Sequence, residues 1–245
     1  MNRIQRISAM LVLAAAVLVV SLTYSIRAFA DLARMARQPF NGPSLTLVLQ
    51  PEPQNSPGTV HPADIQQAKR VLSSRLQGVL SGRPFQLTVE GDRFLVALPP
   101  SENMGYITSV LTSRGEVEFI SGGELPPVGV SISPEMAAQY PVLFTGQDIL
   151  QAQPPNSAGG QIFFRLGLAP DAARQLAEFT AAQTGRYLCM ALDGQVLTCS
   201  RMYQMDGDTL EILPELSSGA ILSLTDVGIF IDSGPLPWPL TATAP

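Results

Sequence analysis

The longest apolar run of the chain lies close to its N-terminus. Residues Ile7 to Ile26 contain no charged residue and no proline. An α-helix rises about 1.5 Å per residue, so this run spans about 30 Å, which is the thickness of the hydrocarbon core of a bilayer. The pattern therefore predicts one membrane-spanning anchor, within an N-terminal region at 1–37 that comprises a cytoplasmic tip, the anchor and a juxtamembrane segment.

A cleaved signal peptide is the alternative interpretation of this region. Arg3 and Arg6 supply a basic n-region, and Ala28-Phe29-Ala30 matches a cleavage site. Against cleavage, the run exceeds the usual hydrophobic region, and Arg27 interrupts the approach to the site. Arginines are balanced on the two sides of the run, so the positive-inside rule leaves its orientation open. The short basic n-region favours export, and we expect the bulk of the chain outside the cytoplasm, as a single-pass protein of the cell membrane.

Residues 44–120 have the periodicity of a βαββαβ unit. Alternating strands and apolar positions at helical spacing predict its elements in this order: a strand at 45–49, a helix from Pro62 to Gly78 or Gly82, a hairpin of 85–89 and 94–98, a helix capped by Ser101 and closed by Gly115, and a strand at 117–120. This order is that of a ferredoxin-like fold. The expected class is α+β, with this unit and the C-terminal segment at about 220–245 forming a base subdomain.

A second, smaller α+β unit is expected at 140–213, as a head subdomain, after a Gly- and Pro-rich connection at 121–144. Its pattern predicts a strand at 161–166, a helix from Pro170 to about Thr184 with Ala173, Leu176 and Ala177 inward, a hairpin of 187–192 and 195–200, and a strand at 209–213. Asp193-Gly194 is the strongest hairpin signal of the chain, because a tight primed turn needs positive φ. The apolar stretch at 221–231 is too short and too polar for a second span.

Two cysteines flank this hairpin turn. A two-residue turn would place Leu188 opposite Cys199, with the two thiols on opposite faces. A three-residue loop centred on Gly194 would place Cys189 directly opposite Cys199, within reach of a disulfide. The sequence leaves open whether the two cysteines are bonded or are small buried apolar residues.

The part of the chain after the predicted anchor is acidic. Beyond Arg37 the chain has ten Lys and Arg residues against 19 Asp and Glu, a net charge of about −9. An acidic surface repels phosphate, which argues against nucleic acid as a partner. The sequence contains no Gly-rich phosphate loop, nucleophile elbow or metalloprotease motif. We therefore expect no catalysis, no cofactor, no metal and no small-molecule ligand.

Two further groups of ionisable residues have side chains that can transfer protons, namely His61 and the pair Glu116 and Glu118. His61 precedes Pro62 at a helix start, where we expect a solvated cap-region residue rather than a base. Glu116 and Glu118 lie two apart on one strand, so their carboxylates share a face. Paired carboxylates can transfer protons, but no pocket or partner for them is predicted.

Several motifs, taken in order, resemble the first large extracytoplasmic domain of SecD, a subunit of the bacterial Sec protein-export apparatus. They are Arg75-Leu76 on the first helix, Phe94 to Pro99, Gly115-Glu116-Val117-Glu118-Phe119, Phe144-Thr145-Gly146-Gln147-Asp148-Ile149, Ala177-Glu178-Phe179-Thr180, Ala191-Leu192-Asp193-Gly194-Gln195-Val196 and Ser233-Gly234-Pro235-Leu236-Pro237. Thr145, Gly146, Asp148, Asp193 and Gly194 occupy turn positions of the family motifs. Their order and spacing across 45–240 make the resemblance specific.

The resemblance implies a base and a head joined by hinge-like connections, with the head contacting emerging preprotein and moving relative to the base. The family's opening motif is reduced here to Phe40-Asn41-Gly42-Pro43, and the chain ends where the family's remaining membrane helices begin. Those helices carry the ionisable residues of a proton pathway, and the anchor here has none. We expect an accessory protein that contacts preprotein or Sec translocon subunits without its own proton pathway. The alternative is a structural or regulatory envelope module that reuses the fold.

Overall fold

The structure, a computed structural model, describes residues 45–52, 60–100, 103–153, 156–158, 161–203, 207–212, 216–217 and 224–243. The predicted anchor at Ile7 to Ile26, the cleavage site at Ala30 and the segment Phe40 to Pro43 lie outside these ranges. In the described ranges, no helix combines the length and the apolar character needed to cross a bilayer. Residues Ser44–Pro245 form one compact unit, and the division into base and head stays a prediction.

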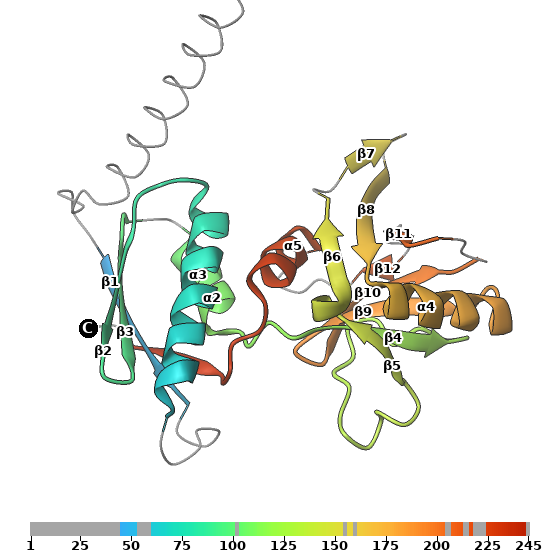
Figure 1. Cartoon of the computed structure of the whole chain (residues 1–245), viewed down its shortest axis with the longest axis horizontal. Helices are drawn as coiled ribbons and strands as arrows, with labels where there is room; N and C mark the ends of the chain where they lie inside the picture. Colours follow the sequence, from blue (N-terminus) through green and yellow to red (C-terminus); the bar gives the residue numbers. More distant parts are fainter. Residues whose placement is uncertain are drawn as a thin grey trace, which may run out of the picture. The chain divides into compact units, whose positions relative to one another are not determined.

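The N-terminal elements of the described chain and its last strand form a four-stranded antiparallel sheet with two helices on one face (Figure 1). Its elements are β1 (Leu45–Pro51), α2 (Pro62–Leu80), β2 (Gln86–Glu90), β3 (Arg93–Leu98), α3 (Met104–Thr112) and β13 (Leu240–Thr243). Helix α2 begins at Pro62, and the exposed His61 caps it by accepting the N–H of Ala63 at its Nδ1. The prediction of a cap-region histidine is therefore confirmed.

The fourth strand of this sheet differs from the prediction. The sheet order is β13-β1-β3-β2, so the place beside β1 belongs to β13 from the C-terminal segment. The strand predicted for that place, at 117–120, is β4 (Val117–Gly123), and it pairs instead with β9 and β5 in another sheet. Local periodicity identifies a strand but does not select its partner, and this part of the prediction was wrong.

The remaining strands form two further antiparallel sheets. One has the order β12-β10-β9-β4-β5 and the other the order β11-β8-β6, with β7 pairing with β8. The elements are β5 (Val142–Thr145), the 3-10 helix η1 (Gly146–Asp148), β6 (Ile149–Ala152), β7 (Asn156–Ala158), β8 (Gln161–Leu168), α4 (Pro170–Ala182), β9 (Tyr187–Leu192), β10 (Gln195–Arg201), β11 (Thr209–Ile212), β12 (Leu216–Ser217) and α5 (Leu224–Ser233). The described chain is α+β, as expected.

Three details of the predicted helices need correction. Helix α4 buries Ala172, Leu176, Phe179 and Thr180. Of the three residues predicted to face inward, Leu176 is buried and Ala173 packs against the core while partly buried, but Ala177 is only partly buried, so the buried face extends further toward Phe179 and Thr180 than predicted. Helix α3 ends at Thr112, before Gly115. Helix α2 continues through Gly78 and ends with Ser81 in the left-handed region at φ 49°. The sequence prediction also missed α5, because Gly228 and Asp226 interrupt its apolar pattern.

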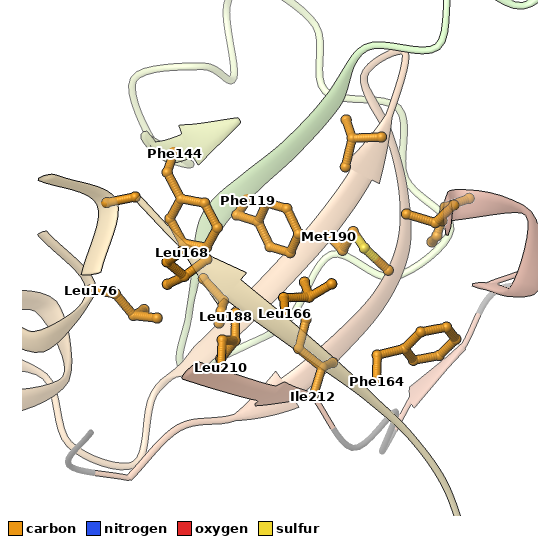
Figure 2. Close-up of a cluster of buried hydrophobic side chains, with 14 of the residues drawn as sticks. Phe119, Phe144, Phe164, Leu166, Leu168, Leu176, Leu188, Met190, Leu210 and Ile212 are labelled. Carbon is orange, nitrogen blue, oxygen red and sulfur yellow. The ribbon is translucent and has the colours of Figure 1, made fainter. Parts of the chain in front are cut away.

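The two largest clusters of buried side chains lie in different parts of the fold. One joins α2 and α3 to the first sheet and includes Leu72, Phe94 and Trp238. The other lies among β4, β8, β9, β11 and α4. Figure 2 shows this second cluster, with Leu176 at one end and Phe164 and Ile212 toward the other. Phe119 and Phe144 stack at its centre, with ring centroids 4.4 Å apart.

Candidate contact site

A partly open cavity of about 220 Å³ lies beside the Phe164 end of the second cluster. It is walled by strands β6, β8, β9 and β11 and by helix α5. Its lining residues are mostly apolar: Ala152, Gln153, Phe164, Leu166, Met190, Ile212, Val227, Gly228, Ile229, Ile231 and Asp232. Asp232 is exposed, and among these lining residues it alone carries a charge. The cavity can hold an apolar group next to a negatively charged rim.

Helix α5 forms one wall of the cavity and packs on α2 through Ile229, which also lines the cavity. Gly78 of α2 leaves room for Ile229, since a Cβ at Gly78 would lie 3.1 Å from Ile229 Cγ1. At the start of α5, the Tyr106 hydroxyl donates to Asp226 Oδ1 at 2.5 Å, and burial together with this bond raises the pKa of Tyr106. Helix α5 is therefore packed closely against α2, while the space between α5 and the strands is partly empty.

Arg75 binds both connections between the first sheet's layer and the rest of the domain. The chain leaves that layer after α3 and returns to it after α5. The fully buried guanidinium donates to the carbonyls of Val110 on α3 and of Ser113 and Arg114 after it. It also donates to the Ser233 hydroxyl at the end of α5 and to the Gly234 carbonyl after it. Its Cζ also lies 4.8 Å from the centroid of the Phe230 ring. Burial lowers the pKa of Arg75 to about 10, although the charge of Asp193 opposes this.

Asp193 does more than turn the chain. It and Gly194 have φ of 50° and 78°, as the predicted primed turn requires. Its carboxylate also accepts hydrogen bonds from the Ser113 hydroxyl, the Gly115 N–H at 3.1 Å and the Glu116 N–H at 2.8 Å. The β9–β10 turn is thereby tied to the α3–β4 connection. The sequence prediction missed this second role, because nothing local in the sequence reports on residues 80 positions away.

Thr145, Gly146 and Asp148 form the cap of η1. The Asp148 carboxylate accepts the N–H of Thr145 at 2.8 Å and its hydroxyl at 3.0 Å. Gly146 lies against β4, where an added Cβ would come within 3.1 Å of the Val117 side chain. A smaller cavity of about 140 Å³ lies here, lined by residues 115–117, 145–147, 230–231 and 234–235. Thr145, Gly146 and Asp193 therefore lie around the start of β4, whereas the Gly194 carbonyl accepts the N–H of Ile132.

Cys189 and Cys199 form a disulfide, with Cα atoms 4.0 Å apart. The turn is the two-residue one, because Gln195 pairs with Leu192. The register then shifts by one residue between Val196 and Thr198, and Cys199 comes opposite Cys189 instead of Leu188. A β-bulge thus brings the sulfurs onto one face, an arrangement that neither sequence alternative contained.

The two strand glutamates have different surroundings. Glu116 forms an exposed ion pair with Arg114 at 2.9 Å. Glu118 is half-buried, and burial raises the pKa of its carboxyl, with a further contribution from the charge of Glu116.

Comparison with known proteins gives a match in fold. No family model matches the chain, and no curated protein matches it in sequence. A crystal structure of SecDF in its super-membrane-facing form matches with a TM-score of 0.61 and 19% identity, over 91% of this chain and 34% of that chain. A second structure, of SecDF described as a membrane component that enhances protein export, matches with a TM-score of 0.60 and 22% identity, over 82% of this chain and 99% of that chain. This chain spans about a third of the length of the first SecDF chain, and its fold is that of a SecDF segment, as the sequence motifs predicted.

Proposed function

We propose that the chain is a membrane-anchored, SecD-like accessory protein whose extracytoplasmic domain contacts preprotein or a translocon component during protein export. It acts by contact, without catalysis and without a proton pathway of its own. The observation that carries the proposal is the partly open apolar cavity beside α5, on a fold shared with SecDF. Unfolded polypeptide differs from folded proteins in exposing apolar side chains, which such a cavity can receive.

Site-specific photo-cross-linking tests this contact. A photoreactive residue at Gln153, on the exposed rim of the cavity, is expected to cross-link to a secretory protein arrested during export. The matched control is Gln67, an exposed glutamine on α2 that does not line the cavity. Equal yields at the two positions, or no product at Gln153 with the protein abundant, would refute preprotein contact at the cavity. Products with an unrelated envelope protein would favour the alternative of a structural or regulatory module.

The membrane topology is part of the proposal. The disulfide suits an oxidising compartment outside the cytoplasm. Alkaline phosphatase fused after Thr243 should therefore be active, since that enzyme needs an oxidising compartment to fold. The mass of the native protein distinguishes a retained anchor at Ile7 to Ile26 from cleavage after Ala30.

We assign the first sheet to the ferredoxin-like class and divide the domain into base and head. The order β13-β1-β3-β2 supports the class, with β13 in the place of the fourth strand. Separate buried clusters on α2 and α3 and on β4, β8 and β9 support the division. We expect hydrogen exchange to show that the two clusters open at different denaturant concentrations. A single cooperative opening of both clusters would refute the division.

A further inference from the structure

Gly228 is the residue of α5 that leaves the cavity open. It lies in the middle of the helix, where glycine is less favourable than alanine. Its φ is not in the left-handed region, so the backbone does not require glycine. A Cβ built at this position would meet no atom of the described residues within 4 Å. Neither the backbone conformation nor crowding by the described residues explains this glycine, which lines the cavity.

The volume of the cavity defines the group that it can take. Apolar cavities of about 150 Å³ lined by Leu, Ile and Phe bind benzene. The cavity here is about 220 Å³, and Phe164, Met190 and Ile212 line it with similar chemistry. It can therefore accept one aromatic or branched aliphatic side chain of the size of Phe or Leu.

The surroundings of the cavity favour an extended polypeptide as the source of that side chain. In the described part of the chain, β6 is the outer strand of its sheet, and Ala152 and Gln153 at its end line the cavity. An extended segment can pair along such an edge while alternate side chains turn toward a pocket. Asp232 at the rim, on a domain of net charge about −9, favours a basic residue next to the apolar one.

We propose that Gly228 determines the specificity of this cavity, which admits one Phe- or Leu-sized side chain of an extended polypeptide with a Lys or Arg beside it. Asp232 contacts the basic residue. The inference rests on the proposed function and deepens it, because it names the sequence feature that the contact site selects.

Peptide binding to the full chain in lipid nanodiscs tests the inference. The probes are fluorescent Ser/Thr dodecapeptides with a central Phe-Lys, Leu-Lys, Ala-Lys or Phe-Glu pair, and the readout is fluorescence anisotropy. Burial of the Phe or Leu side chain should make those Lys peptides bind about tenfold or more tightly than the Ala-Lys peptide. Gly228→Leu should abolish this preference by filling the cavity. Gly105→Leu is the matched control, because Gly105 also lies in a helix, α3, with open space around it. Asp232→Asn should remove the preference for Phe-Lys over Phe-Glu, an effect of about twofold to fivefold at low salt.

The outcomes separate this inference from the proposed function. Equal binding of the Phe-Lys and Ala-Lys peptides, or an unchanged preference in Gly228→Leu, would overturn the role of Gly228. A larger loss of thermal stability in Gly228→Leu than in Gly105→Leu would also overturn it, because the cavity would then not be free to take a leucine side chain. If Gln153 still cross-links preprotein in Gly228→Leu, the proposed function stands and only the specificity inference falls. If Gln153 of the unaltered protein gives no cross-link, the proposed function falls, whatever the peptides show.

Discussion

Replacing Arg75 by Met should loosen both connections between the first sheet's layer and the rest of the domain. Methionine keeps much of the volume of the arginine stem but removes every donor. Three of the lost hydrogen bonds run to the carbonyls of Val110, Ser113 and Arg114 at the end of α3. Hydrogen bonds to a charged group contribute about 1.5–3 kcal/mol each, but bonds made by one side chain do not add in full.

Burying a cation costs free energy, and the same burial lowers the pKa of Arg75 to about 10. This cost offsets part of the stability that the hydrogen bonds contribute. We therefore expect Arg75→Met to lower the free energy of unfolding by about 3–5 kcal/mol. In a domain of about 200 residues this corresponds to a decrease in Tm of about 6–20 °C. The free energy of unfolding of Arg75→Lys should lie between those of Arg75→Met and of the unaltered protein, because one ammonium group cannot reach both connections with the geometry of a guanidinium.

Thermal unfolding of the detergent-solubilised full chain, followed by circular dichroism, measures this effect. The control is Arg83→Met, since Arg83 is exposed just after α2 and should change the stability by less than about 0.5 kcal/mol. Hydrogen exchange should show faster opening at 113–116 and 233–236 in Arg75→Met. If Arg75→Met and Arg83→Met shift the Tm equally, the buried network does not hold the two connections, and the reasoning is refuted.

Three other changes follow from the same geometry. Gly115→Ala should destabilise the domain by more than Gly91→Ala. Both glycines have positive φ, but only at Gly115 would the added Cβ lie 2.1 Å from the buried guanidinium of Arg75. The denaturant midpoints of the two variants measure the difference. Cys189→Ala combined with Cys199→Ala should cost about 2–3 kcal/mol for a disulfide closing a loop of this length, and reducing agent should lower the Tm of the unaltered protein but not of the double variant. The pKa of Glu118 is raised in the folded state, so its ionisation destabilises the fold: its contribution to stability is greatest below its unfolded pKa and falls as the pH rises through the folded pKa. Glu118→Gln should accordingly be more stable than the unaltered protein at pH 7, and the difference should vanish as the pH falls to about 4; a difference that does not depend on pH would contradict this cause.

Several motifs that indicated the SecD resemblance meet at one place in the fold. Arg75 binds the connection that carries Ser113 and Arg114 and the one that carries Ser233 and Gly234. The two connections also bind each other, because the Leu236 N–H donates to the Arg114 carbonyl at 2.8 Å. Sequence positions that look unrelated therefore share one structural task, which is to hold this junction.

Local patterns in the sequence determined much of the secondary structure. Apolar spacing and a proline at the first turn predicted helices α2 and α4, and alternation around Gly91 and around Asp193-Gly194 predicted both hairpins. These features depend on residues within one turn or one strand of each other, so the information is local. For α5 the sequence predicted only an apolar stretch and not a helix, because a glycine within a helix weakens the periodic signal.

The tertiary structure decided what depends on distant residues. The pairing of β13 with β1 joins residues nearly 200 positions apart, and strand periodicity contains no information about that choice. A one-residue bulge after Val196 decided that the cysteines face each other. The cavity beside Gly228 exists because α5 packs closely on α2 and also meets β6, β8, β9 and β11, which lie apart in the sequence. Burial, partner choice and empty volume are properties of the packed chain, and the sequence pattern alone does not contain them.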